Sequence, residues 1–316
     1  MATIEQVGHD YHRRQEQISM AAVRSAVQQW DRLAPDSLTE SWLSGIGRLV
    51  LALVAGAQLA AAEEANPYLE ELAAAQGVAL GDSALVVADA LAGIASDGRS
   101  LESLLYMPIV FTKRWIGEGR SVPEALRHGR QFMALLASTQ VADAGRAATT
   151  VGITGNRRFT TYVRMLSLPS CSRCIILSGR QYSWSEGFAR HPRCDCWHAA
   201  IVHDGTGPLP GASPRRIFDG MTEQQQDKAF GKAGAEAIRL GSDLGQVVNA
   251  RRGMQVAGER LVTTEGTSRR GFAGRRMGAT TGRRFAIRPM PEQILQDAAG
   301  DRDEAVRLLR RFGYLT

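Results

Sequence analysis

All four cysteines of this 316-residue chain fall between positions 171 and 196, and this clustering limits what the chain can fold into more than any other feature. Cys171 and Cys174 are separated by two residues, so their thiolates can bind one metal ion across a tight turn. The stretch 191–198 (HPRCDCWH) adds two thiolates and two imidazoles. A cysteine pair followed by a His/Cys cluster is typical of a closed, structural Zn²⁺ site. The candidate ligands are Cys171, Cys174, His191, Cys194 and Cys196.

The choice of four ligands from this set stays open. The first three cysteines are the firmest, and either His191 or Cys196 completes the site. His198 is better explained as a packing residue or as a hydrogen-bonding partner of a ligand. Disulfides would suit a secreted chain, but no signal peptide opens this sequence. Unrelated buried thiols fit poorly with four cysteines so close together.

The spacing around the cysteines resembles a known family. The pattern Cys-x-x-Cys-x-x-Leu-x-Gly-x-x-Tyr, followed by Phe-x-x-His-Pro-x-Cys-x-Cys, is similar to the Mu F-like head-morphogenesis proteins of tailed bacteriophages. Three later stretches, 247–254, 263–266 and 307–315, resemble members from phages of actinobacteria. The pattern is carried by Cys171, Cys174, Leu177, Gly179, Tyr182, Phe188, His191, Pro192, Cys194 and Cys196.

The resemblance covers about residues 150 to 316, and it implies a role. The family implies a minor capsid protein that is present in few copies near the portal and takes part in head assembly and DNA delivery. The implied partners are the portal protein and other head proteins. The implied location is the virion, with the host cytoplasm during assembly.

Charge is divided unevenly along the chain. Residues 1–150 carry 12 basic and 17 acidic side chains, a net charge of −5, whereas residues 151–316 carry 26 and 15, a net charge of +11. This asymmetry indicates two partners of different sign, or an acidic half that faces protein and a basic half that faces nucleic acid.

Residues 1–148 show helical periodicity and predict a bundle. Thr3 and Gln6 have the spacing of a capping box, as do Ser121 and Glu124. Pro108 should kink or split the helix that contains it. One apolar stripe recurs at three-, four- and seven-residue steps, at Val7, Tyr11, Ile18, Val27 and Trp30. We expect helices at about 3–34, 38–62, 67–75, 83–95, 101–117 and 122–147.

The apolar segment 49–62 raises the question of a membrane. It has only 14 residues and lies between Arg48 and Glu63. A membrane span needs about 20 apolar residues. We therefore interpret the segment as a buried bundle helix and predict no membrane partner.

A composition shift near 148 predicts a boundary, followed by a Mu F-like zinc-binding module over 149–245. Residues 159–165 have the β-branched and aromatic content of a strand. A turn and short strand are expected at 178–183 and another strand at 197–202, with helix over 222–240. Such a module has few apolar residues for a core, and zinc would supply its order.

Residues 246–288 form a basic stretch that we predict to be an extended Arg/Gly-rich arm. It holds ten arginines against Glu259 and Glu265. Arginine pairs spaced by glycine suit contacts with the phosphates of double-stranded DNA, which release counterions without reading sequence. A solvated linker, or a segment that orders only against a capsid partner, is the alternative. The candidate DNA contacts are Arg251, Arg252, Arg269, Arg270, Arg275, Arg276, Arg283 and Arg284.

Residues 289–316 regain helical signals and predict a C-terminal docking element. Asp301 and Glu304 have capping-box spacing, and Gly313 suits the residue after a helix. The whole chain is thus expected to be mainly α with a small α+β zinc-stabilised module.

Catalytic motifs are sparse. The sequence has no phosphate-binding loop of the Walker type, no nucleophile elbow, no His-Glu-x-x-His and no dinucleotide fingerprint. A zinc-stabilised nuclease using His198, His203 and Asp204 is one alternative, and a generic zinc-stabilised DNA-binding module is another. We predict a non-enzymatic protein with no small-molecule substrate.

Overall fold

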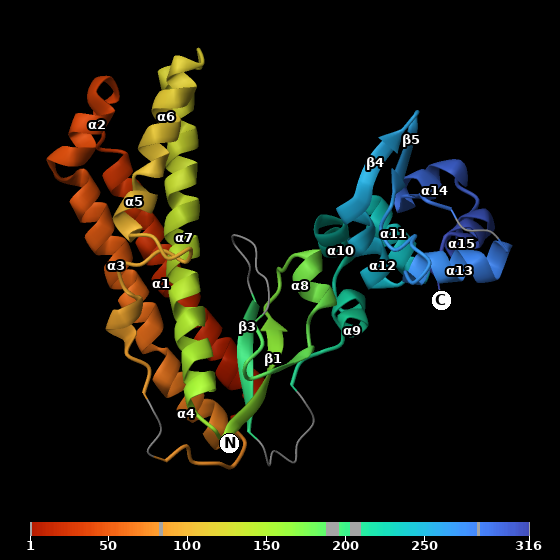
Figure 1. The fold of residues 1–316 in the computed structure, drawn as a ribbon, viewed down its shortest axis with the longest axis horizontal. Helices are drawn as coiled ribbons and strands as arrows, with labels where there is room; N and C mark the ends of the chain where they lie inside the picture. Colours follow the sequence, from red (N-terminus) through yellow and green to blue (C-terminus); the bar gives the residue numbers. More distant parts are fainter. Residues whose placement is uncertain (1, 82–84, 188–195, 203–209, 283–284, 316) are drawn as a thin grey trace. The chain divides into compact units, whose positions relative to one another are not determined.

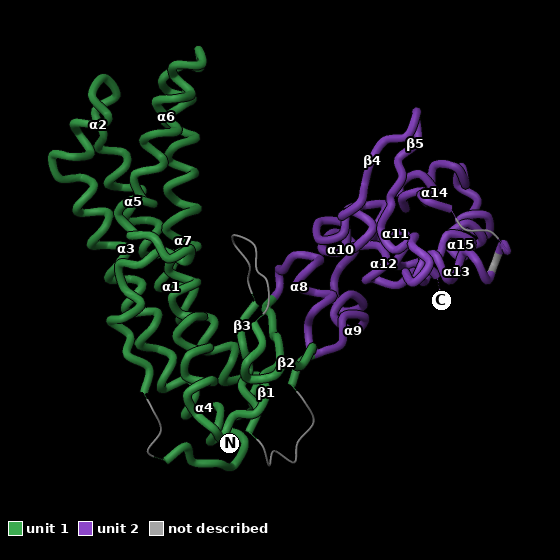
Figure 2. The backbone as a smooth tube through the Cα atoms, in the orientation of Figure 1, with its two compact units in different colours: residues 1–167, 180–211 green, residues 168–179, 212–316 purple. Residues whose placement is uncertain are grey.

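The computed structural model describes residues 2–81, 85–187, 196–202, 210–282 and 285–315. Helix accounts for 63% and strand for 10%, so the mainly α prediction is confirmed. The chain divides into two compact units, shown in Figure 2. The first unit contains Met1–Ser167 and Arg180–Gly211, and the second contains Leu168–Gly179 and Ala212–Thr316. The boundary predicted near 148 falls inside a helix of the first unit.

The first unit is a helical bundle built on three long helices, α1, α3 and α7, which lie side by side in Figure 1. Its core includes Ala26, Trp30, Val50, Leu105 and Met133. The helices are α1 (Ile4–Trp30), α2 (Leu38–Ser41), α3 (Gly47–Glu63), α4 (Ala65–Ala75), α5 (Leu101–Leu105), α6 (Met107–Gly117) and α7 (Val122–Gly155), with shorter helical turns η1 (Pro35–Ser37), η2 (Trp42–Ile46) and η3 (Ala88–Leu91).

Local signals account for several helix ends. Thr3 and Gln6 form the predicted capping box at the start of α1. The break between α5 and α6 falls at Tyr106, close to Pro108, as predicted. The capping box predicted at Ser121 is wrong, because its side chain makes no cap hydrogen bond. The helix predicted over 83–95 is also wrong, since the described residues there form only the short turn η3.

The apolar helical stretch Pro35–Ala75 is long and apolar enough to cross a membrane by length and composition. In the bundle, α3 buries one face, which includes Val50 and Val54, against the core. Leu49 and Leu53 on the same helix are exposed by 48% and 37%. The prediction of a buried helix therefore holds for one face only.

A three-stranded antiparallel sheet completes the first unit. Its order is β2-β1-β3, from β1 (Phe159–Leu166), β2 (Gln181–Ser183) and β3 (Cys196–Val202), which confirms the three predicted strands. Tyr162 in β1 faces Tyr182 and Ala200 on the flanking strands. The sheet shares a core with the bundle, where Tyr11 stacks on Tyr68 with ring centroids 3.8 Å apart. The strands thus pack with the amino-terminal helices, and not in a separate module.

The second unit is made of short helices. Thr222 forms a capping box with Gln225 at the start of α10, and Asp301 caps α15 by accepting from two backbone N–H groups. Gly231, with φ +75°, divides the predicted helix over 222–240 into α10 and α11. The helices are α8 (Ser172–Ile176), α9 (Pro214–Asp219), α10 (Glu223–Phe230), α11 (Lys232–Arg239), α12 (Leu244–Ala250), α13 (Phe272–Thr281), α14 (Pro291–Asp297) and α15 (Arg302–Arg311).

The prediction of an extended arm over 246–288 is wrong. This segment contains α12, the turn η4 (Arg251–Gly253), α13 and an antiparallel sheet of order β4-β5-β6. The strands are β4 (Met254–Ala257), β5 (Arg260–Thr263) and β6 (Arg288–Pro289). The sheet is held to α12 by a contact between residues distant in sequence: the Thr263 hydroxyl in β5 donates to the Ala250 carbonyl.

Arg288 is the centre of that packing and is fully buried. Its guanidinium donates to the carbonyls of Phe312 and Gly313 at 3.0 and 3.3 Å, and to Gln246 Oε1 at 3.2 Å. It also lies over the Tyr314 ring, 4.1 Å from the ring centroid. An arginine of the predicted arm is therefore a core residue that fastens the carboxyl-terminal turn.

Candidate functional site

The predicted zinc ligands fall in different parts of the structure. Cys171 is the N-cap of α8, where its sulfur accepts from the Cys174 backbone N–H at 3.4 Å. This pair belongs to the second unit, and Cys196, which begins β3, belongs to the first. His191 and Cys194 lie outside the described residues. Among the residues that the structure describes, no group of three or more His, Cys, Asp or Glu side chains is arranged to hold a metal, so a zinc module is not shown.

The alternative nuclease set is only partly described. His198 is buried in the sheet, where its ring packs edge-on against Tyr162 with centroids 4.8 Å apart. Its backbone carbonyl accepts a hydrogen bond of 2.6 Å from the Tyr68 hydroxyl. His203 and Asp204 lie outside the described residues. The position of His198 fits the packing role expected for it.

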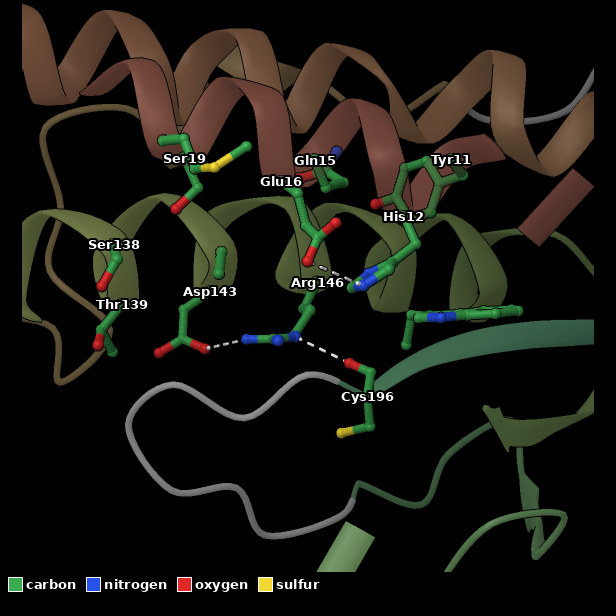
Figure 3. Close-up of a pocket in the computed structure, with 13 residues that line it drawn as sticks. Tyr11, His12, Gln15, Glu16, Ser19, Ser138, Thr139, Asp143, Arg146 and Cys196 are labelled. Carbon is green, nitrogen blue, oxygen red and sulfur yellow. Dashed lines mark hydrogen bonds and ion pairs between the residues drawn. The ribbon is translucent and has the colours of Figure 1, made fainter. Parts of the chain in front are cut away.

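Figure 3 shows a pocket of about 310 Å³ within the first unit, between α1, α7 and the start of β3. Its charged side chains pair with one another. His12 Nε2 lies 3.5 Å from Glu16, and Arg146 Nη1 lies 3.4 Å from Asp143. Arg146 Nε also donates to the Cys196 backbone carbonyl at 3.1 Å, while the cysteine sulfur points away from Arg146. Arg146 therefore links α7 to β3, whereas His12 and Glu16 are neighbours on α1.

Sequence reasoning missed this pocket. Its two close side-chain pairs, His12 with Glu16 and Arg146 with Asp143, have the (i, i+4) and (i, i+3) spacing of neighbours on a helix face. The contact of α7 with β3 has no such local signal, because about 50 residues separate Arg146 from Cys196.

The predicted DNA-contacting arginines divide into three groups. Arg251 pairs with Glu292 at 3.1 Å and donates to the Phe230 carbonyl, and Arg252 donates to Asn249. Arg283 and Arg284 lie outside the described residues. The remaining four arginines are exposed. Arg269 and Arg270 lie in the turn before α13, and Arg275 and Arg276 lie within it; together they are called the α13 arginines.

These α13 arginines differ in their partners from five other arginines of the second unit, which pair with carboxylates. Across the described ranges, no ion pair involves Arg269, Arg270 or Arg275. Arg276 lies over the Phe272 ring, 5.6 Å from its centroid. The described arginines of this unit that do pair with carboxylates are Arg215, Arg239, Arg251, Arg260 and Arg307. Within the described residues the charges of Arg269, Arg270 and Arg275 are therefore not cancelled by ion pairs, and this surface can attract a polyanion.

No family model matches this sequence, and neither does any curated protein or solved structure. The phage-family resemblance therefore stays a prediction from the sequence motif.

Proposed function

We propose that this chain is a non-enzymatic head-assembly protein of a tailed bacteriophage whose second unit contacts the backbone of double-stranded DNA. The resemblance of the Cys/His motif supports the first part. One structural observation carries the second: four exposed arginines gather at α13, and at least three of them have no ion pair in the described chain. Each phosphate contact releases counterions and strengthens binding at low salt.

A salt titration against random-sequence duplex DNA tests the DNA contact. Four phosphate contacts correspond to a slope of about −4 in log affinity against log salt. Replacing Arg269, Arg270, Arg275 and Arg276 with Ser should remove a slope of about that size. The matched control replaces an equal number of carboxylate-paired arginines of the same unit, Arg215, Arg239, Arg260 and Arg307, and should change the slope much less. A flat response in the unaltered chain contradicts the DNA contact.

Incorporation into heads tests the assembly role. The apolar stripe of α1 cannot be the docking surface, because Val7, Tyr11, Val27 and Trp30 are buried in the bundle. The exposed Leu49 and Leu53 of α3 are available to a protein partner, which we propose to be the portal. Leu49→Ser with Leu53→Ser should reduce copurification with heads while thermal unfolding stays unchanged. Normal incorporation would exclude α3 as the docking surface.

Structural zinc remains a separate proposal from the sequence motif. Elemental analysis of chain purified without chelator should give about one zinc per chain, and Cys174→Ser should lower it. Absence of zinc in the unaltered chain contradicts it.

A further inference from the structure

The last turn of α15 carries two more arginines, Arg310 and Arg311, both exposed. The helices α13 and α15 are in contact. Just after α15, Gly313 packs against α13, where an added Cβ would lie 3.0 Å from Ala273 Cα and 3.3 Å from Arg276 Cβ. The end of α15 therefore abuts α13 beside one of its exposed arginines.

Within the described residues, neither Arg310 nor Arg311 is neutralised by an ion pair. The nearby Glu304 is bound by Arg307 through both carboxylate oxygens at 2.7 and 2.6 Å. The Arg311 guanidinium lies over the Phe312 ring, 5.5 Å from its centroid, much as Arg276 lies over Phe272. The Phe312 ring contacts the flat face of the Arg311 guanidinium, which restrains that side chain without neutralising it and leaves its N–H edge available to an anion.

Hydrogen bonds from buried side chains fix the orientation of the turn that follows α15. The buried Arg288 donates to the carbonyls of Phe312 and Gly313, and the Tyr314 hydroxyl donates to the Pro289 carbonyl at 2.9 Å. A fixed turn loses little conformational freedom when its side chains bind a ligand, which favours affinity.

We propose that Arg310 and Arg311 join the α13 arginines in one phosphate-binding face for the backbone of double-stranded DNA. This inference rests on the proposed function and extends its site to a second element. Cations at the carboxyl end of a helix also interact favourably with the helix dipole. That role does not explain why a second cluster of exposed arginines abuts the first, because like charges repel unless an anion lies between them.

The experiment uses the full chain and a random-sequence DNA duplex, with affinity measured from low to moderate salt. Arg310→Ser with Arg311→Ser should reduce the slope by up to about 2, at about 0.9 for each lost phosphate contact. Arg310→Lys with Arg311→Lys should keep the slope, because the charge is kept. Arg307→Ser is the matched control on the same helix and should leave the slope within about 0.3 of the original, since Glu304 already neutralises that arginine.

The outcomes separate this inference from the proposed function. If the α13 quadruple variant loses slope and the Arg310/Arg311 serine variant keeps it, the α15 extension is overturned and the α13 contact stands. A flat response in the unaltered chain overturns both. Should the serine variant unfold, arginine modification by phenylglyoxal gives an independent measurement on the unaltered chain. DNA should protect Arg310 and Arg311 but leave Arg215 reactive, and equal reactivity of all three with and without DNA overturns the inference.

Discussion

Arginines pair with carboxylates in both units, but at α13 and at the end of α15 two arginines have aromatic rings as neighbours. In the first unit the ion pairs are Arg13–Asp10, Arg14–Glu64, Arg99–Asp97, Arg114–Glu118, Arg120–Glu124, Arg130–Asp31 and Arg146–Asp143. In the second, Arg276 and Arg311 lie over phenylalanine rings at the proposed DNA face. Exposed ion pairs add little stability, but they cancel the field that a distant polyanion would sense. The number of arginines in a segment therefore says less about its partner than the neighbours of each one.

The two units also differ in what fixes their packing. The Trp197 indole of the first unit lies against the backbone of Gly8 in α1, where a side chain would not fit. The second unit is fastened by one buried cation, Arg288, and its bonds to the carboxyl-terminal turn. Substitutions at these points should destabilise one unit and leave the other folded.

The largest effect is expected for Arg288→Ala. This change removes three hydrogen bonds and the contact with Tyr314, and opens a cavity, at a cost of about 4 kcal/mol to the second unit. Burial lowers the pKa of Arg288, so relief of its desolvation offsets part of this cost. Urea unfolding combined with hydrogen exchange should assign the loss to the second unit.

Arg260→Ala is the control for that substitution. Arg260 is half-exposed and pairs with Asp297 at the surface of the same unit, so its loss should cost about 0.5 kcal/mol. Equal losses for the two variants would show that Arg288 is not the fastening residue.

Alkaline pH should affect the first unit through its buried tyrosines. Burial raises the pKa of Tyr11 to about 12, from an ordinary value of about 10. Between these values the unfolded chain releases a proton that the folded chain keeps, so stability falls as pH rises from about 10 to 12. The difference between the folded and unfolded pKa values of Tyr11 corresponds to about 3 kcal/mol. Unfolding measured at several pH values should show a weaker decline for Tyr11→Phe, and identical declines would exclude this cause.

Gly8→Ala should cost the first unit about 2 kcal/mol, because the added methyl overlaps the buried Trp197 ring. Gly56→Ala in α3 is a matched control, since nothing lies within 4 Å of its added Cβ. Because position 56 is exposed, alanine there should stabilise the helix by up to about 1 kcal/mol. Thermal unfolding should therefore shift in opposite directions for the two variants, and a shared direction would contradict the close contact.

Local patterns predicted the elements that depend on neighbours in sequence. The capping box at Thr3, the break near Pro108 and strand β1 all follow from short-range preferences. The failed helix over 83–95 has a physical reason in tertiary contacts. Gln58 Oε1 accepts from the Gly93 backbone and Gln58 Nε2 donates to the Ile94 carbonyl, while Asn66 bonds both backbone groups of Val86. Bundle side chains thus supply hydrogen bonds that a helix would otherwise make internally.

The candidate DNA-binding arginines likewise divide into those that composition predicted and those whose roles depend on distant partners. Exposure of the α13 arginines agrees with the arginine-rich composition that predicted them. The pairing of Arg251 with Glu292 and the burial of Arg288 depend on partners many residues away, so composition alone predicted an arm where the chain is folded. Arg310 and Arg311 were missed because their helix was interpreted only as a docking element, although the adjacent pair repeats the pattern of the arm.

Apart from the control substitutions, the smallest predicted loss of stability separates the folding of α15 from its charge. Asp301 Oδ1 accepts from the backbone N–H groups of Asp303 and Glu304 at 2.9 and 3.1 Å, so Asp301→Ala should cost about 1 kcal/mol. The cap lies at the opposite end of the helix from Arg310 and Arg311, and fraying there leaves both arginines in place. Stability of the second unit should therefore fall while the salt slope of DNA binding stays constant.

Thr3→Ala is the corresponding change in the first unit, where it removes the cap of α1 at a similar cost. Hydrogen exchange should then report the loss in the first unit alone. A change of salt slope in the Asp301 variant would mean that the amino-terminal end of α15 also takes part in the DNA-binding face, and would shift the proposed boundary of that face.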